Sequence, residues 1–272
     1  MPSIPADRNV QTHASAVPTR FAMTTSSRAH VRSTQCDDVW IVTLDRASRA
    51  NAYTTDMLRD FANLLDEAEH AVDIRAAVIT GAGGAFSGGA DLGELSSRDE
   101  KDALDLLSRD VFDRWARAPW PTIAAITGAA VGGGFELALA CDVRVCGRHA
   151  RFAFPELSHG LVPAAGGIRR LVAQVGTART SELVLFARTL DAETAVSWGI
   201  AAAVVDEPLA YAVDWARGRR SPDAIAARLA KMLIEDAAGG LVGRNVEAIA
   251  QALCYRRRQL RTQSEQQISG DA

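Results

Sequence analysis

Several features that would assign a protein to a membrane, a disulfide scaffold or a nucleic acid are missing from this 272-residue sequence. No apolar run approaches the roughly 18 residues that a membrane-spanning helix needs. There are only four cysteines and no C-x-x-C pair, which argues against a disulfide framework and against a structural zinc site. Lysine and arginine number 30 against 33 aspartates and glutamates, so no basic excess attracts nucleic acid or an anionic membrane. We therefore expect no metal ion, no nucleic-acid partner and no membrane partner.

Three common catalytic or nucleotide-binding motifs are also missing. Residues 81–91 and 128–134 are dense in glycine, but neither stretch reads G-x-G-x-x-G, because Phe86 and Leu137 stand where the last glycine belongs. The sequence contains no G-x-x-x-x-G-K-[ST] and no G-x-S-x-G. Dinucleotide binding, a P-loop and a nucleophile elbow are therefore not indicated.

The first 36 residues differ from the rest. They are rich in serine, threonine and arginine, poor in acidic residues, and show no hydrophobic period or apolar core of a secretory signal. We expect residues 1–36 to be a disordered extension. Its composition leaves organelle import open, and a cytoplasmic location is the expectation otherwise.

The whole chain is 48% hydrophobic, which is enough for a large core. β-branched and apolar runs predict strands at 39–44, 76–80, 122–126, 143–145, 151–154 and 203–205. Helical spacing predicts helices at about 54–71, 99–118, 135–140, 167–175, 178–187, 191–198, 208–217, 222–236 and 243–262. The expected organisation is an α/β core over residues 37–200 and a helical region over residues 201–272.

Both glycine-rich loops follow a predicted buried strand, and the second opens a helix. Glycine lets another group approach the backbone N–H groups closely, and a helix N-terminus adds unpaired donors. Two such loops suggest two N–H donors that converge on one oxygen. Glu136 lies in the first turn of the second helix among apolar neighbours, and Glu156 follows the apolar run 152–155. A carboxylate in such surroundings is costly unless it is paired or used, although either residue alone has an ordinary structural explanation.

Four segments together resemble the crotonase family, and most closely the enoyl-CoA hydratases. They read AFSGGADL at 85–92, ITGAAVGGGFELA at 126–138, FPE at 154–156 with GLVPAAGG at 160–167, and LDR at 44–46 with NA at 51–52. The resemblance covers about residues 39–231, and glutamate stands at both positions of the hydratases' acid/base pair. It implies a spiral of ββα turns, a helical C-terminal region that supports a homotrimer or a dimer of trimers, and a role in fatty-acid metabolism.

The resemblance also implies the parts of a site. The backbone N–H groups of Ala90 and Gly133 would bind the thioester carbonyl, Glu136 would activate water, and Glu156 would exchange the proton at the α-carbon. The CoA moiety would face a further set of residues, namely Arg49, Ala50, Ala52, Gly89, Asp91 and Leu92. No metal or cofactor is implied, since CoA is part of the acyl-CoA substrate.

Three departures from the family pattern affect this assignment. Ala164 replaces a glycine whose N–H helps to hold the catalytic water, and alanine resists a positive φ. Ile168 and Arg169 replace the commoner Thr-Gln. The family's C-terminal acidic-glycine and Glu-Lys-Arg pattern is absent, and residues 248–259 stand there instead. This run contains Arg256, Arg257 and Arg258, which either meet CoA phosphates or form a solvated basic helix end.

The leading interpretation is an enoyl-CoA hydratase that adds water across the 2,3 double bond of an α,β-unsaturated thioester. One alternative is a double-bond isomerase, which depends on Glu156 more than on Glu136. Another is a hydratase or dehydratase of carrier-protein thioesters in a biosynthetic pathway. A binding protein without activity is disfavoured, because packing alone does not require two buried carboxylates.

Overall fold

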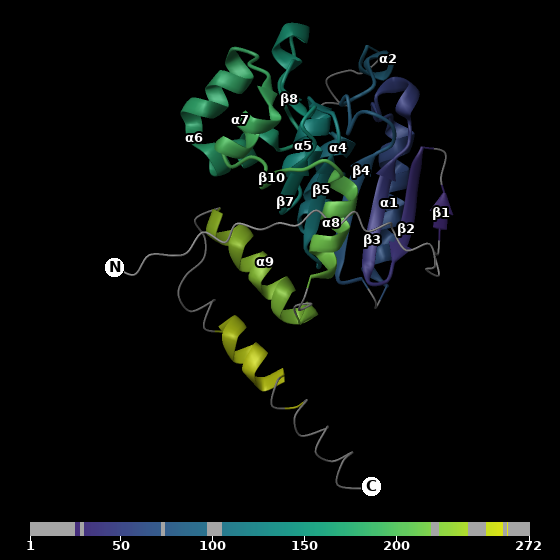
Figure 1. Cartoon of the computed structure of the whole chain (residues 1–272), viewed down its shortest axis with the longest axis vertical. Helices are drawn as coiled ribbons and strands as arrows, with labels where there is room; N and C mark the ends of the chain where they lie inside the picture. Colours follow the sequence, from purple (N-terminus) through teal and green to yellow (C-terminus); the bar gives the residue numbers. More distant parts are fainter. Residues whose placement is uncertain are drawn as a thin grey trace, which may run out of the picture.

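The computed structural model describes residues 25–27, 30–71, 74–96, 105–218, 223–238, 249–257 and 260. Strands and helices alternate in the first half, and helices predominate after residue 205, as predicted (Figure 1). The described strands form a seven-stranded sheet and a three-stranded sheet. The predicted α/β class with a helical C-terminal part is therefore confirmed.

The larger sheet is antiparallel at one edge and parallel elsewhere. In spatial order its strands are β1 (Thr25–Ser27), β2 (Val31–Cys36), β3 (Val39–Leu44), β4 (Ala76–Gly81), β5 (Thr122–Ile126), β7 (Val143–Cys146) and β10 (Ala203–Val204). β1, β2 and β3 pair antiparallel, and every later pair is parallel. β5 is buried along its whole length, as expected for a parallel strand that is covered on both faces.

The smaller sheet consists of β6 (Ala129–Val131), β8 (Arg151–Ala153) and β9 (Leu190–Asp191). β6 and β8 are parallel, and β8 and β9 are antiparallel. Two isolated bridges, Tyr53 with Ala90 and Ser87 with Ala130, continue this pairing into the first glycine-rich loop. The sequence analysis did not predict β6, β9 or these bridges.

Except for α2 (Leu92–Leu95), which was not predicted, the labelled helices lie close to their predicted ranges. They are α1 (Thr55–Glu69), α4 (Leu107–Ala116), α5 (Gly133–Leu139), α6 (Gly167–Leu185), α7 (Ala192–Ser197), α8 (Pro208–Arg217) and α9 (Ala224–Ala238), with 3-10 turns η1 (Ala47–Arg49) and η2 (Glu156–His159). The Thr54 hydroxyl caps α1 by accepting a hydrogen bond from the Met57 N–H at 3.2 Å. α6 breaks at Gly176, where φ is 79°, so the two predicted helices on either side are confirmed.

The core has two parts, one on each face of the larger sheet. The main part lies under α1, α4 and α5 and contains fully buried aromatic side chains such as Trp115 and Phe135. On the other face, Ala212 of α8 packs with Val78, Ile123 and Val145 of the sheet (Figure 1). No helix in the described part of the chain is both long enough and apolar enough to cross a membrane.

Three predicted boundaries need correction. Residues 25–27 and 31–36 are not part of a disordered extension: β1 pairs with β2, β2 pairs along its whole length with β3, and Val31 is fully buried. The prediction failed because these outer strands have few apolar residues to reveal them. β10 and α8 belong to the core sheet and its cover, so the core does not end at residue 200. Asp105 and Leu106 are not helical, and α4 begins at Leu107.

Some predictions fall partly outside the described residues. These are residues 1–24 of the expected extension, residues 97–104 of the helix predicted from residue 99, and most of 243–262 apart from a described helical segment at 249–257. That segment lies at the opposite end of the molecule from α2 (Figure 1). Arg257 pairs there with Asp223 at 3.7 Å. Arg258 is outside the described residues.

Candidate active site

The candidate site forms where several extended segments end side by side. The Ser87 carbonyl accepts from the Val131 N–H at 2.9 Å, which joins the first glycine-rich loop to β6. The Ala153 carbonyl accepts from the Gly132 N–H at 2.9 Å, which joins β6 to β8. Because these segments run parallel, the residues that follow them meet at one edge. Ala90, Gly133 and Glu156 are thus brought together from three separate parts of the sequence.

The geometry leaves the Ala90 and Gly133 N–H groups available. The Tyr53 N–H donates to the Gly89 carbonyl at 2.8 Å, and the Asp91 N–H donates to the Tyr53 carbonyl at 2.9 Å. These bonds flank Ala90, whose own N–H therefore faces away from Tyr53. Gly133 is the first residue of α5, where an N–H has no partner within the helix. Neither N–H donates to an acceptor within the described ranges.

The two glycine-rich loops are in direct contact. A Cβ atom on Gly89 would lie 3.2 Å from the Gly133 nitrogen and 2.8 Å from the Val131 carbonyl oxygen. Gly89 also has a φ of 92°, which side chains rarely adopt. Glycine at this position therefore lets the first loop approach the backbone nitrogen of Gly133 closely.

Glu136 is held in the interior by the backbone that begins α6. Its side chain is only 3% exposed, and its Oε1 atom accepts from the N–H groups of Ala165 at 2.8 Å and Gly167 at 2.9 Å. Burial raises the pKa of Glu136, while these two N–H bonds and the Arg170 charge oppose the rise. The two donors also fix the orientation of the carboxylate, and sequence analysis missed both of them.

Glu156 begins η2 directly after Pro155 and lies over the second glycine-rich loop. A Cβ on Gly132 would be 3.0 Å from the Glu156 Oε1 atom. Its Oε2 atom is buried and has no hydrogen-bond partner in the described part of the chain. Burial, with a further contribution from the Glu136 charge, raises the pKa of Glu156 to about 7. A carboxyl group that is poised near neutral pH and has one unpartnered oxygen is suited to proton transfer.

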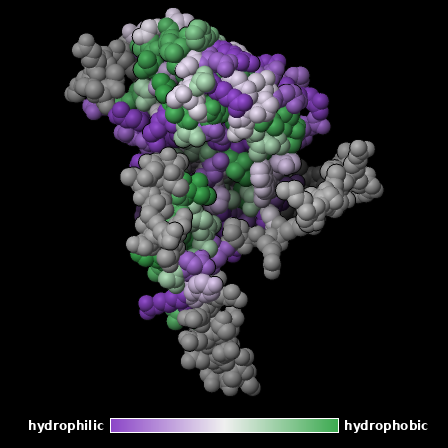
Figure 2. Space-filling view, turned by 90° about the vertical axis from the view of Figure 1, so that its left-hand side faces the viewer, coloured by the Kyte–Doolittle hydropathy of each residue, from purple (hydrophilic) through white to green (hydrophobic). Residues whose placement is uncertain are grey.

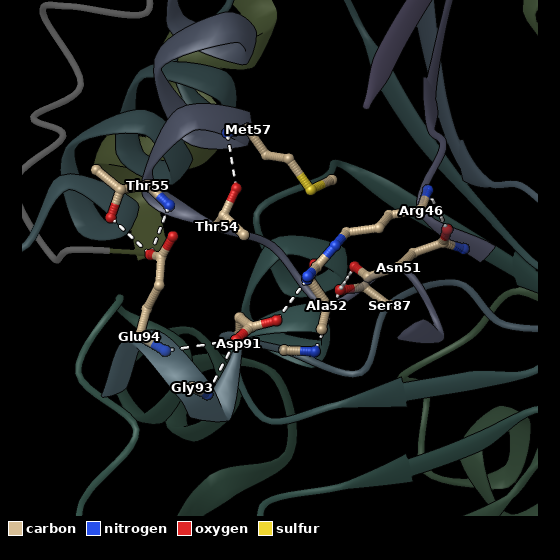
Figure 3. Close-up of polar contacts among 11 residues, drawn as sticks. Arg46, Asn51, Ala52, Thr54, Thr55, Met57, Ser87, Asp91, Gly93 and Glu94 are labelled. Carbon is tan, nitrogen blue, oxygen red and sulfur yellow. Dashed lines mark hydrogen bonds and ion pairs between the residues drawn. The ribbon is translucent and has the colours of Figure 1, made fainter. Parts of the chain in front are cut away.

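The loop at 46–52 is locked by two polar side chains for which sequence analysis predicted no role (Figure 3). Arg46 donates to the Ala52 carbonyl at 3.0 Å and pairs with Asp91 at 2.5 Å. The fully buried Asn51 donates to two carbonyls of the first glycine-rich loop, each at 2.8 Å. Ala50 and Asn51 both have positive φ, at 50° and 55°. A strained loop that is held this firmly presents a fixed backbone surface.

Of the predicted CoA-facing residues, Arg49, Ala50 and Ala52 lie within this locked loop, and Gly89, Asp91 and Leu92 lie at or after the end of the first glycine-rich loop. Arg49, Ala50 and Leu92 are exposed, and Gly89 is buried. The Asp91 side chain is already engaged, because it caps α2 and pairs with Arg46, which lowers its pKa. Its backbone is engaged as well, because the Asp91 N–H donates to the Tyr53 carbonyl at 2.9 Å and its carbonyl accepts from the Leu95 N–H at 3.0 Å. Asp91 therefore shapes this region and offers no free polar group to a ligand.

Ala164 does not have the left-handed backbone that sequence analysis considered. The residues other than glycine with positive φ in the described part are Asp37, Ala50, Asn51 and Ala187. Ala164 is exposed, and the next residue supplies one of the donors to Glu136. Arg169, which replaces the family's glutamine, pairs with Asp113 at 3.0 Å. Within the described residues, no group of three or more His, Cys, Asp and Glu side chains could hold a metal ion.

Comparison with known proteins gives consistent matches. The profile of the family described as enoyl-CoA hydratase/isomerase matches residues 34–251. A probable enoyl-CoA hydratase of Mycobacterium bovis is 37% identical over 204 residues, which cover 73% of this chain and 78% of the relative. The 2,3-dehydroadipyl-CoA hydratase of Escherichia coli is 37% identical over 193 residues, which cover 70% of this chain and 76% of the relative. A crystal structure assigned to an enoyl-CoA hydratase of Thermobifida fusca, in complex with CoA, is 32% identical with a TM-score of 0.76, and the match covers 87% of this chain and 95% of that one.

Proposed function

The chain belongs to the enoyl-CoA hydratase/isomerase family, and on that premise we propose that it adds water reversibly across the 2,3 double bond of α,β-unsaturated acyl-CoA thioesters. The observation that carries the proposal is the placement of Glu136 and Glu156. Both carboxylates adjoin the second glycine-rich loop, and the charge of Glu136 raises the pKa of Glu156. Hydration needs one group to take a proton from water and another to give a proton to carbon.

The N–H groups of Ala90 and Gly133 bind the thioester oxygen in this proposal. Attack of water at C3 moves electron density through C2 onto the carbonyl, so negative charge develops on that oxygen. Fixed backbone donors stabilise the charge without having to reorganise, and the loss of one such donor costs about 3 kcal/mol of barrier. Two donors on adjoining rigid loops, with no other acceptor in the described structure, meet this requirement.

The two glutamates divide the proton transfers. In this proposal the ionised form of Glu136 takes a proton from water as the hydroxyl adds to C3. The Ala165 and Gly167 N–H groups bind its Oε1 atom and favour that form, which opposes the rise in pKa caused by burial. Glu156 is protonated near neutral pH and gives its proton to C2. One proton leaves the pair and one enters it, so the pair carries one proton before and after the reaction. The N–H of Ala164, one residue before the Glu136-binding segment, is proposed to help position the water.

The CoA portion is proposed to lie against the locked loop at 46–52 and the start of α2. The exposed Arg49, Ala50 and Leu92 would face it, with Ala52, Gly89 and Asp91 beside them in the same two segments. The Thermobifida fusca structure was solved with CoA, which supports the same class of ligand here. We propose no other cofactor.

We also propose that the chain assembles as a homotrimer or a dimer of trimers. Large apolar side chains are exposed on η2, on the loop that follows it and on α6, and Figure 2 shows apolar patches among polar ones on the face that includes α6. The exposed residues concerned are Leu157, Leu161, Val162, Ile168, Val172, Leu185 and Phe186. Light scattering at micromolar concentration tests the assembly, and a monomeric mass contradicts it.

Double-bond isomerisation is the second candidate. Glu156 alone, with an unpartnered oxygen and a pKa of about 7, suits removal of a proton from C2 or C4 and its return at the other carbon. Purified protein should be given crotonyl-CoA, a 3-enoyl-CoA and a crotonyl carrier-protein thioester in parallel. Loss of the enoyl-thioester absorbance of crotonyl-CoA supports the hydratase. Turnover of the 3-enoyl-CoA alone supports the isomerase, and turnover of the carrier-protein thioester alone supports the biosynthetic alternative.

A further inference from the structure

Tyr53 bonds to the residues on either side of Ala90 and lies against Gly133, although neither sequence analysis nor the proposed chemistry gives it a role. It lies between the locked loop at 46–52 and α1, and only 5% of it is exposed. Its main chain bonds to Gly89 and Asp91, the residues on either side of Ala90. The direction of the Ala90 N–H is therefore set by the backbone of Tyr53.

The side chain of Tyr53 reaches the other donor. A Cβ on Gly133 would lie 2.0 Å from the Tyr53 hydroxyl oxygen and 2.8 Å from its Cζ. The tip of the ring thus occupies the space in which any larger residue at 133 would place its side chain. Phe112 of α4 packs edge-on against the same ring, with the centroids 5.6 Å apart, and limits its movement away from Gly133.

We propose that Tyr53 is a positioning residue that sets the separation of the Ala90 and Gly133 N–H groups. This inference rests on the proposed function, because the separation matters only if one thioester oxygen binds both donors. The backbone of Tyr53 holds one donor and its ring supports the residue that carries the other. A single residue therefore couples two loops whose donor residues, Ala90 and Gly133, lie more than 40 positions apart in the sequence. A displacement of about 1 Å at such a site costs up to about 100-fold in rate.

The competing explanation is that Tyr53 only fills the core. Phe61 is a matched control for that explanation, because it is 2% exposed, belongs to the same core and packs on Trp115. If Tyr53 only packs in the core, then Tyr53→Leu and Phe61→Leu should lower the melting temperature by similar amounts. The two variants should then also have similar kcat values.

The experiment compares Tyr53→Phe, Tyr53→Leu and Phe61→Leu in the full-length protein. For each variant, kcat and KM for crotonyl-CoA are measured together with the dissociation constant of free CoA. A cinnamoyl-CoA probe is also added, because its absorbance moves to longer wavelength when its carbonyl accepts strong hydrogen bonds. This spectral shift reports on the two donors without requiring turnover.

We expect Tyr53→Leu to lower kcat by about 100-fold and to reduce the spectral shift of the probe, with KM and CoA affinity within about twofold of the wild type. Tyr53→Phe removes only the hydroxyl and should lower kcat by about three- to tenfold. Phe61→Leu should keep both kcat and the spectral shift. If Tyr53→Leu does not fold, the test depends on Tyr53→Phe alone. A Tyr53→Phe variant with the kcat of the wild type and the same spectral shift of the probe overturns the proposal.

The proposal and the proposed function can fail separately. If wild-type protein hydrates crotonyl-CoA but Tyr53→Leu matches Phe61→Leu in kcat and spectral shift, the positioning role is overturned and the hydratase stands. If wild-type protein hydrates no enoyl-CoA but shifts the probe in a manner that depends on Tyr53, the positioning role is supported and the proposed reaction is wrong.

Discussion

Titration of Glu156 should control the activity at alkaline pH. Its pKa is raised to about 7, first by burial and second by the charge of Glu136. The proposed reaction needs one proton on the pair of glutamates, so loss of the last proton, from Glu156, inactivates the enzyme. The pH dependence of kcat/KM should therefore show a limb near pH 7 that belongs to this residue.

The magnitude follows from simple titration. Above pH 7, kcat/KM should fall about tenfold per pH unit, so a value at pH 9 should be roughly 100-fold below the plateau. The same limb is expected for hydration and for dehydration. Hydration and dehydration pass through the same transition state, in which Glu136 and Glu156 together carry one proton. The equilibrium between the enoyl thioester and its hydrated product involves no charged reacting group, so it does not depend on pH. Since the pKa of Glu136 is also raised, its protonation should produce a second limb on the acid side.

The assay measures initial rates in both directions from pH 5 to 9, with circular dichroism at each pH as the control for folding. Glu156→Gln should abolish the limb near pH 7 and leave a low rate that no longer falls between pH 7 and 9. The reasoning is refuted if wild-type kcat/KM stays level up to pH 9. It is also refuted if the limb persists unchanged in Glu156→Gln.

Three further predictions follow from the same geometry. Glu136→Gln and Glu156→Gln should each lower kcat at least ~100-fold with circular dichroism unchanged; an effect of Glu156→Gln alone would favour the isomerase. Gly133→Ala places a Cβ against the Tyr53 ring and should cost about 1–3 kcal/mol of stability by overpacking. Adding Tyr53→Leu to Gly133→Ala should restore the melting temperature but not kcat. If the melting temperature is not restored, the contact between residue 133 and the Tyr53 ring is disproved. Finally, the pKa of Glu156 is higher in the folded state than in the unfolded state, so its ionisation destabilises the fold above pH 7 and has no effect below about pH 4.5. Glu156→Gln should raise the melting temperature by roughly 2–3 °C at pH 8, on the order of 1 kcal/mol after allowance for its partial exposure, and not at pH 4.5; equal shifts at both pH values would contradict this.

The sequence predicted the parts of the fold that depend on local pattern. The period of α1 and its Thr54 cap, the buried β5 and the break of α6 at Gly176 all follow from residue type and spacing. β2 was missed because only its first and last residues are apolar, as suits an outer antiparallel strand.

The candidate site was only partly predictable, for a physical reason. Glu136 and Glu156 stand out because a carboxylate in an apolar run needs an explanation. By contrast, the N–H groups of Ala165 and Gly167 have no sequence signal, because their direction depends on how the loop before α6 folds over Glu136. Tyr53 was missed because its contact with Gly133 joins positions 80 residues apart, which no local pattern reveals.

The account depends most on the claim that Glu136 directs water onto the enoyl thioester. Crotonyl-CoA incubated with the enzyme in ¹⁸O-labelled water should give 3-hydroxybutyryl-CoA that carries one ¹⁸O atom, detected by mass spectrometry of the product. The account predicts rapid incorporation with wild-type protein and a loss of at least ~100-fold with Glu136→Gln. Absence of labelled product with wild-type protein, or equal rates of incorporation in the two proteins, would contradict it.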